Sequence, residues 1–93
     1  MRRKAVSRDD AEAIALSGLA MLADDPARME RFLALSGVAP GDIRAVASTA
    51  AFQLAVLGHI RSDESLLLSF AANNGIDPEA VGEAERVLGA PPR

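Results

Sequence analysis

Residues 62–79 have the sequence SDESLLLSFAANNGIDPE, which contains one whole helix with its start and stop signals. Asp63 supplies a side-chain acceptor of the kind that begins helices, and Glu64 follows in the first turn, where the helix dipole favours an acid. Gly75 ends the helix because glycine readily adopts the left-handed conformation. Asp77 and Pro78 then begin another helix, with proline in its first turn. The stretch therefore predicts short helices joined by tight turns.

Signals of the same kind recur along the whole chain. Together they predict six helices. Four of them cover about residues 8–23, 26–36, 40–48 and 50–61. The fifth begins at residues 62–64 and ends at residues 73–75, and the sixth begins at residues 77–79 and is closed by Gly89. The helix over 50–61 is apolar nearly all round, which is typical of a central, buried helix. We expect the helix over 8–23 to be covered on two faces, because Leu16, Ala20 and Ala23 lie opposite its main apolar stripe. Ala39 is a poor cap, so the third helix should fray at its start.

Composition agrees with an all-α chain. Hydrophobic residues make up 49% of the 93 residues, only three are aromatic, and Ala and Leu, both strong helix formers, account for most of the others. Residues that favour strands are scarce. We expect one domain over residues 1–93, a compact bundle of five to six short helices, with residues 1–6 as a disordered basic arm and residues 90–93 as a tail.

A shift of 38 residues aligns the two halves of the chain. It pairs Asp25 with Asp63, Phe32 with Phe70, Gly37 with Gly75, and Pro40 with Pro78. Two pseudo-symmetric three-helix units would explain these matches. The alternative is that any chain of short amphipathic helices repeats its start and stop signals, although that does not easily explain the paired phenylalanines.

Charge and residue types narrow the classes of function. The net charge is −3 and there is no cysteine, so we expect a cytoplasmic protein without disulfides, metal or cofactor, and without membrane contact. Nucleic-acid binding is disfavoured by the acidic surface. The basic arm at Arg2, Arg3 and Lys4 is the place where such contact would occur, although terminal charge runs are usually solvated.

His59 is the one side chain that titrates near neutrality. Used as a general base or ligand contact, it would need an orienting partner and a pocket lined by its helix. The nearest acid in sequence, Asp63, lies beyond a predicted helix break. A structural role is the simpler interpretation, since a helix end favours a charged His. We therefore expect no catalytic residue.

Leu66, Leu67 and Leu68 form a run in which at least one leucine must point away from the buried face of its helix. Leu68 is the surplus side chain. Cover by another helix of the same chain is the simpler explanation, and contact with a partner or a second copy is the alternative.

Three stretches carry a resemblance to a known family: GVAP at 37–40, DESLLLSF at 63–70 and GIDPE at 75–79. With these, the chain from about residue 8 to 89 resembles a family of small alphaproteobacterial proteins catalogued as domain of unknown function 3572. It departs from the pattern at Ala39, where the resemblance leads us to expect an acid like Asp77. The resemblance implies a bacterial, cytoplasmic, helical protein, and no activity or functional residue.

These observations favour a non-catalytic protein that binds an unknown protein partner or associates with itself, with Leu66 and Leu68 as the candidate contacts. Two other functions stay open. One is a regulator that contacts nucleic acid through the basic arm, and the other is a small-ligand binder or enzyme that uses His59.

Overall fold

The computed structural model describes residues 6–91 of the chain. This part of the chain forms seven short helical segments. They are α1 (Arg8–Ala23), α2 (Pro26–Ser36), the 3-10 turn η1 (Pro40–Asp42), α3 (Ile43–Val46), α4 (Ala50–Arg61), α5 (Glu64–Asn74) and α6 (Pro78–Gly89). This range contains no strand, so the all-α prediction is confirmed, and most helix bounds agree with those expected. Of the arm predicted over residues 1–6, residues 1–5 lie outside the described residues, and Val6 is half-buried against the core.

The two turns paired by the 38-residue shift have nearly the same backbone. Asp25 has φ −125° and ψ 104°, and Asp63 has φ −127° and ψ 108°. The Asp25 carboxylate accepts the Ala27 and Arg28 N–H groups, and the Asp63 carboxylate accepts the Leu66 N–H. Gly37 and Gly75 close these helices in the left-handed region, with φ 76° and 63°. The repeat is therefore present in the local structure as well as in the sequence.

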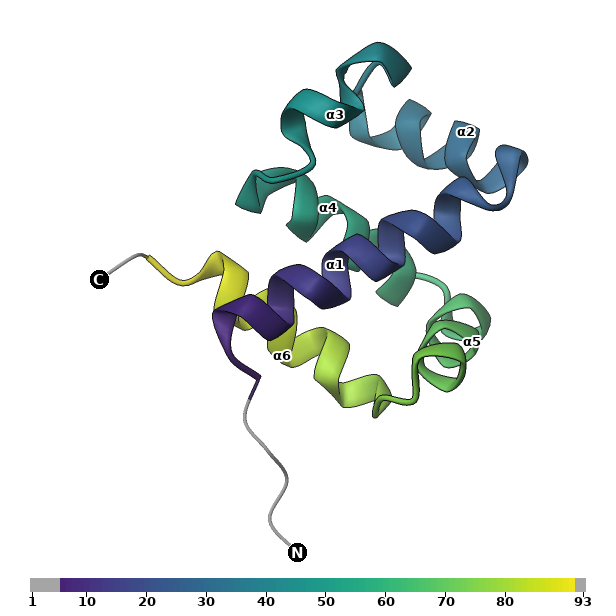
Figure 1. Cartoon of the computed structure of the whole chain (residues 1–93). Coiled ribbons are helices and arrows are strands. Elements are labelled where there is room, and N and C mark those ends of the chain that lie inside the picture. The colour runs from purple at the N-terminus through teal and green to yellow at the C-terminus, as the bar shows by residue number, and fades with distance from the viewer. Residues whose placement is uncertain (1–5, 92–93) are drawn as a thin grey trace, which may run out of the picture.

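Helices α1, α4 and α6 form the centre of the molecule, with α2 and α5 packed outside them (Figure 1). Helices α1 and α4 approach closely at Gly18, where an added Cβ would lie 2.7 Å from Ile60 Cδ1 and 3.1 Å from Val56 Cγ1. All three phenylalanines of the chain are buried in the core. The apolar helix over 50–61 is central, as its composition predicts.

The two third helices of the repeat differ. Helix α6 packs along both α1 and α4, whereas η1 and α3 have no comparable contact with either. Asp77 caps α6 by accepting the Glu79 N–H at 2.9 Å, but Ala39 makes no cap bond, and the chain there begins as a 3-10 turn. The pseudo-symmetry thus holds for α1, α2, α4 and α5 and fails for the third helices.

The short α3 is held by side chains at the start of α4. Thr49 Oγ1 donates to the Val46 carbonyl at 2.7 Å and accepts the Phe52 N–H at 3.2 Å. The buried Gln53 donates from Nε2 to the Ala47 carbonyl at 3.1 Å. These bonds satisfy carbonyls at the end of α3, which a helix of four residues leaves without partners.

Two expectations are wrong, one about burial and one about a helix end. Helix α1 is covered on one face only, since Leu16 is 49% exposed and Ala20 and Ala23 are also exposed. The outer face of α1 has no neighbour because α2 and α5 pack at its sides (Figure 1). Gly89 does not close α6 in the left-handed region, because α6 includes it and ends in extended backbone at Ala90.

Within residues 6–91, no single helix is long and apolar enough to cross a membrane. One pair does meet the criteria of length and composition, Pro40–Val46 with Ala50–Arg61, but it is bent by 117°.

Candidate functional site

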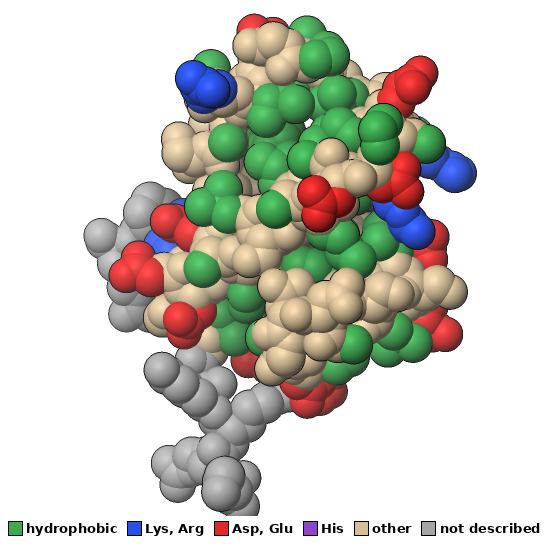
Figure 2. All heavy atoms as spheres, turned by 45° about the vertical axis from the view of Figure 1, so that its right-hand side comes forward, with side chains coloured by type: hydrophobic (Ala, Val, Ile, Leu, Met, Phe, Trp, Pro, Cys, Tyr) green, Lys and Arg blue, Asp and Glu red, His purple; other side chains and the backbone are tan. Residues whose placement is uncertain are grey.

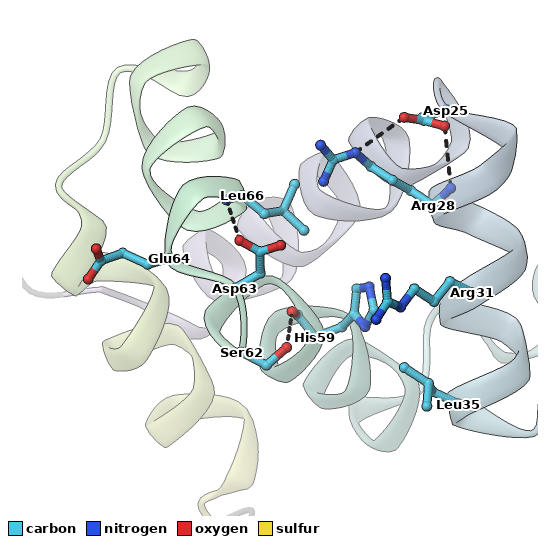
Figure 3. Close-up of a pocket in the computed structure, with 9 residues that line it drawn as sticks. All are labelled: Asp25, Arg28, Arg31, Leu35, His59, Ser62, Asp63, Glu64 and Leu66. Atoms are coloured by element: carbon cyan, nitrogen blue, oxygen red, sulfur yellow. Dashed lines mark hydrogen bonds and ion pairs between the residues drawn. The ribbon is translucent and has the colours of Figure 1, made fainter.

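An open cleft of about 730 Å³ separates α2 from the junction of α4 and α5 (Figure 3). We call it the α2–α5 cleft. Its lining comes from the start and middle of α2, the end of α4 and the start of α5: Asp25, Arg28, Arg31, Leu35, His59, Ser62, Asp63, Glu64 and Leu66. The two capped turns of the repeat thus meet at this cleft, one on each side.

A smaller apolar hollow of about 200 Å³ continues the cleft along α2 and α4. This α2–α4 groove is lined by Phe32, Leu35, Ser36, Ala55 and His59, of which Leu35 and His59 also line the cleft. Leu35 is 72% exposed, more than Leu16 or Leu68, the other large exposed hydrophobic residues of the described chain. Hydrophobic side chains gather over the upper half of the face drawn in Figure 2, and Arg and acidic side chains border them.

Two arginines of α2 point across the cleft, while Leu35 points toward the groove (Figure 3). Arg28 pairs with Asp25, whose carboxylate lies 3.2 Å from Arg28 Nε. The Arg31 guanidinium makes no ion pair or side-chain hydrogen bond within residues 6–91, and it lies beside the His59 imidazole in this view. Spacings of three and four residues place these three side chains on one side of α2.

His59 lies half-buried on α4, between the two hollows. Its ring meets that of Phe32 edge to face, with centroids 5.3 Å apart. Burial lowers the pKa of His59 from 6.5, the Arg31 and Arg28 charges lower it further, and the Asp63 carboxylate raises it. The surroundings therefore oppose the charged form of His59.

One of the acids that line the cleft also has a structural role. Asp63 accepts the Leu66 N–H at 3.1 Å as the cap of α5. Glu64 also lines the cleft, although its carboxylate is directed away from α2 in Figure 3. No carboxylate hydrogen-bonds to the His59 imidazole within the described residues, so His59 has no orienting partner of the kind that general bases use. In the same part of the chain, no three His, Asp or Glu side chains are placed to hold a metal ion.

The three consecutive leucines of α5 differ in their exposure to solvent. Leu66 is 3% exposed and belongs to the core, so its side chain is not available as the contact that the sequence suggested. Leu67 is half-buried against the core. Leu68 is 50% exposed, which shows that no helix of the described chain covers it, contrary to the simpler expectation. The other candidate contacts, Arg2, Arg3 and Lys4, lie outside the described residues.

Sequence reasoning did not single out Arg28, Arg31 or Leu35. A signal for them was present: they recur at the spacing of one helix face, and Leu35 lies outside the apolar stripe of its own helix. The argument that marked Leu68 as surplus applies equally to Leu35.

Comparison with known proteins shows the family of this chain. The model of the family described as "Protein of unknown function (DUF3572)" matches residues 8–91, nearly the whole chain. Neither a curated protein nor a solved structure matches this chain.

Proposed function

Since the chain belongs to the DUF3572 family of proteins of unknown function, we propose a function from its surface: a non-catalytic module that receives another protein in the α2–α4 groove. As part of the same proposal, it acts in the bacterial cytoplasm. No step of chemistry is assigned to it.

The observation that carries the proposal is the exposure of Leu35 beside an apolar hollow. Single exposed leucines are common on protein surfaces. Leu35 differs because it is 72% exposed and borders a concave site lined by Phe32 and Ala55. An exposed apolar residue next to an apolar hollow, with charged groups at the edge, is typical of a surface that a partner covers.

Affinity capture with matched variants tests this proposal. The tagged protein would be expressed in its own cells beside the variants Leu35→Asp and Asn73→Asp. Asn73 is the position that the 38-residue shift pairs with Leu35, and it is also an exposed residue near the end of an outer helix. Both substitutions add one charge, so the pair separates the groove from a general effect of charge.

We expect a partner that is captured by the unmodified protein and by Asn73→Asp, and lost with Leu35→Asp. Calorimetry with that purified partner should reproduce the loss, at about tenfold or more in affinity for an interface anchor. Partners unchanged by Leu35→Asp would overturn the proposal.

Self-association through Leu68 is a second candidate, supported by the 50% exposure of this side chain on α5. Light scattering at high protein concentration measures it directly. A dimer that Leu68→Ser dissociates would favour this surface, and a strictly monomeric protein would remove it.

Small-ligand binding at His59 is a third candidate. It is supported by two features expected of it: a cleft lined by the helix of His59, and a pKa of His59 that its surroundings lower. Because the chain has a single His, an NMR titration of His59 in the presence of small anions reports this kind of binding without ambiguity.

A further inference from the structure

The outer helices α2 and α5 occupy matching places in the repeat but are anchored unequally (Figure 1). Helix α5 buries three residues, Leu66, Phe70 and Ala71, and packs against α4, α6 and α1. Helix α2 buries Phe32 alone, and its main neighbours are α1 and α4. The open cleft already separates α2 from the junction of α4 and α5 (Figure 3). Because fewer buried side chains hold α2, it should open locally more readily than α5.

The contact that holds α2 against α4 includes a titratable ring. Phe32 meets the His59 imidazole edge to face, with centroids 5.3 Å apart. The 38-residue shift pairs Phe32 with Phe70 and pairs His59 with Met21 of α1. The half of the repeat that contains α5 therefore has no titratable side chain at the matched position, and any effect of a proton here is specific to α2.

The groups that oppose a charge on His59 belong largely to α2. Burial lowers the pKa of His59 most, and Phe32 supplies part of the cover. The guanidiniums of Arg31 and Arg28, both on α2, lower this pKa further. Asp63 raises it, and this carboxylate lies in the turn between α4 and α5. When α2 moves away, His59 therefore loses the groups that oppose its charge and keeps the one that favours it.

Two more acids line the same cleft. Asp25 caps the start of α2, and its carboxylate lies 3.2 Å from Arg28 Nε, so it moves with α2 together with its partner. Glu64 stands at the start of α5, and its carboxylate is directed away from α2 in Figure 3. Both acids and Asp63 are included in the charge balance of the cleft, in which burial remains the largest influence on His59.

We propose that α2 is a pH-sensitive flap: protonation of His59 releases α2 from α4, while α1, α4, α5 and α6 keep their packing. The charged imidazole regains water once α2 has left, so proton binding and the release of α2 favour each other. The α2–α4 groove exists only while α2 lies on α4, and acid therefore removes the groove as well. The inference concerns the attachment of α2 and holds whether or not the groove binds a partner.

Native-state hydrogen exchange of the full chain tests the inference. For each amide, the exchange rate divided by the intrinsic rate at the same pH gives an opening constant, the ratio of open to closed molecules. Amides of α2 are compared with those of α5 between about pH 7.5 and 5.5. The variants are His59→Gln, Arg31→Gln and Ser69→Gln, of which the last changes the residue that the shift pairs with Arg31. Arg31 and Ser69 are both exposed, so these two variants should fold.

We expect a larger opening constant for α2 than for α5 at every pH in this range. Low concentrations of urea should change the opening of α2 little, because a local opening exposes little surface, and should promote the opening of α5 as they promote global unfolding. The opening constant of α2 should rise as the pH falls through the ordinary pKa of His, by at most about tenfold per pH unit, the limit for one proton.

The variants assign this rise to His59. His59→Gln should abolish the rise in the opening of α2. Arg31→Gln should raise the pKa of His59, measured from the NMR signal of the single imidazole, and should make the rise smaller. Ser69→Gln should change neither quantity.

Three outcomes would overturn the inference. Equal opening constants for α2 and α5, with the same dependence on urea, would show that α2 leaves only when the whole protein unfolds. A rise that survives His59→Gln would assign the pH dependence to another group. Should His59→Gln fail to fold, Arg31→Gln decides, since an unchanged pKa of His59 together with an unchanged rise would contradict the linkage.

Discussion

The ring of Phe32 on α2 meets the imidazole of His59 on α4 edge to face, at a centroid separation of 5.3 Å, and meets the ring of Phe52 at 5.7 Å. Phe32 is the one buried residue of α2. The contact that attaches this outer helix therefore also forms a wall of the groove, so the stability of α2 and the shape of the site depend on the same side chain.

Replacing Phe32 with Ala should lower the free energy of unfolding by about 3–5 kcal/mol, because it removes a buried ring and leaves a cavity. The exposed neighbour Leu35 provides the control, since Leu35→Ala should change stability by only about 0.5 kcal/mol or less. Urea denaturation followed by circular dichroism measures both. Similar losses for the two variants would show that α2 is not anchored through Phe32.

Stability should fall as the pH is lowered below the ordinary His value. The surroundings lower the pKa of folded His59 from 6.5, so between these two values the unfolded chain binds the proton more readily. The stabilising contribution is complete above 6.5 and is lost as the pH falls through the pKa of the folded state. Urea denaturation from about pH 7.5 to 5.5 measures this slope, and His59→Gln should reduce it. A slope unchanged by that substitution would assign it to other groups.

Gly18 and Gly58 should respond in opposite directions to substitution by Ala. At Gly18 the new methyl group would lie 2.7 Å from Ile60 Cδ1, and overpacking of about 1–3 kcal/mol should outweigh the gain in helix propensity. At Gly58 the nearest neighbour of an added Cβ is Glu85 Oε2, 3.8 Å away, so Ala should stabilise by about 0.5–1 kcal/mol. Thermal unfolding of both variants measures these changes in stability. A stabilising effect of Gly18→Ala would show that the α1–α4 crossing can relax.

Ala39→Asp should stabilise the protein by about 1 kcal/mol. Ala39 has φ −73° and ψ 143°, close to the φ −71° and ψ 134° of Asp77, so an Asp there can cap the segment that follows as Asp77 caps α6. The reverse change, Asp77→Ala, should cost about the same amount. Denaturant unfolding of the two variants measures the cap in both halves, and no gain at position 39 would mean that the 3-10 turn cannot use it.

The local structure was predictable almost residue by residue. The starts at Asp25, Asp63 and Asp77 and the stops at Gly37 and Gly75 depend on neighbours within about four residues, which the sequence displays directly. The weak cap at Ala39 correctly indicated a poor start for the third helix, although the length of α3 was overestimated.

The candidate site was predictable only in part. His59 was recognised as a special residue, but its lowered pKa depends on Arg31 and Arg28, which reach it from a different helix. The leucine run was correctly seen to have a surplus member. Which leucines remain exposed depends on the helices that pack against each face, and the sequence does not show these contacts.

Sequence alone was sufficient for most of the helices, most of their ends and the twofold repetition of their signals, because hydrogen bonds and backbone conformations at helix ends involve residues close together in the chain. The arrangement of those helices required long-range packing. Helix α6 packs along α1 and α4. Helix α2 packs on the outside of the bundle through the buried side chain of Phe32, and Leu35 remains exposed at the groove. Burial is a property of surfaces that distant segments bring together, so the groove beside Leu35 exists only in the assembled fold.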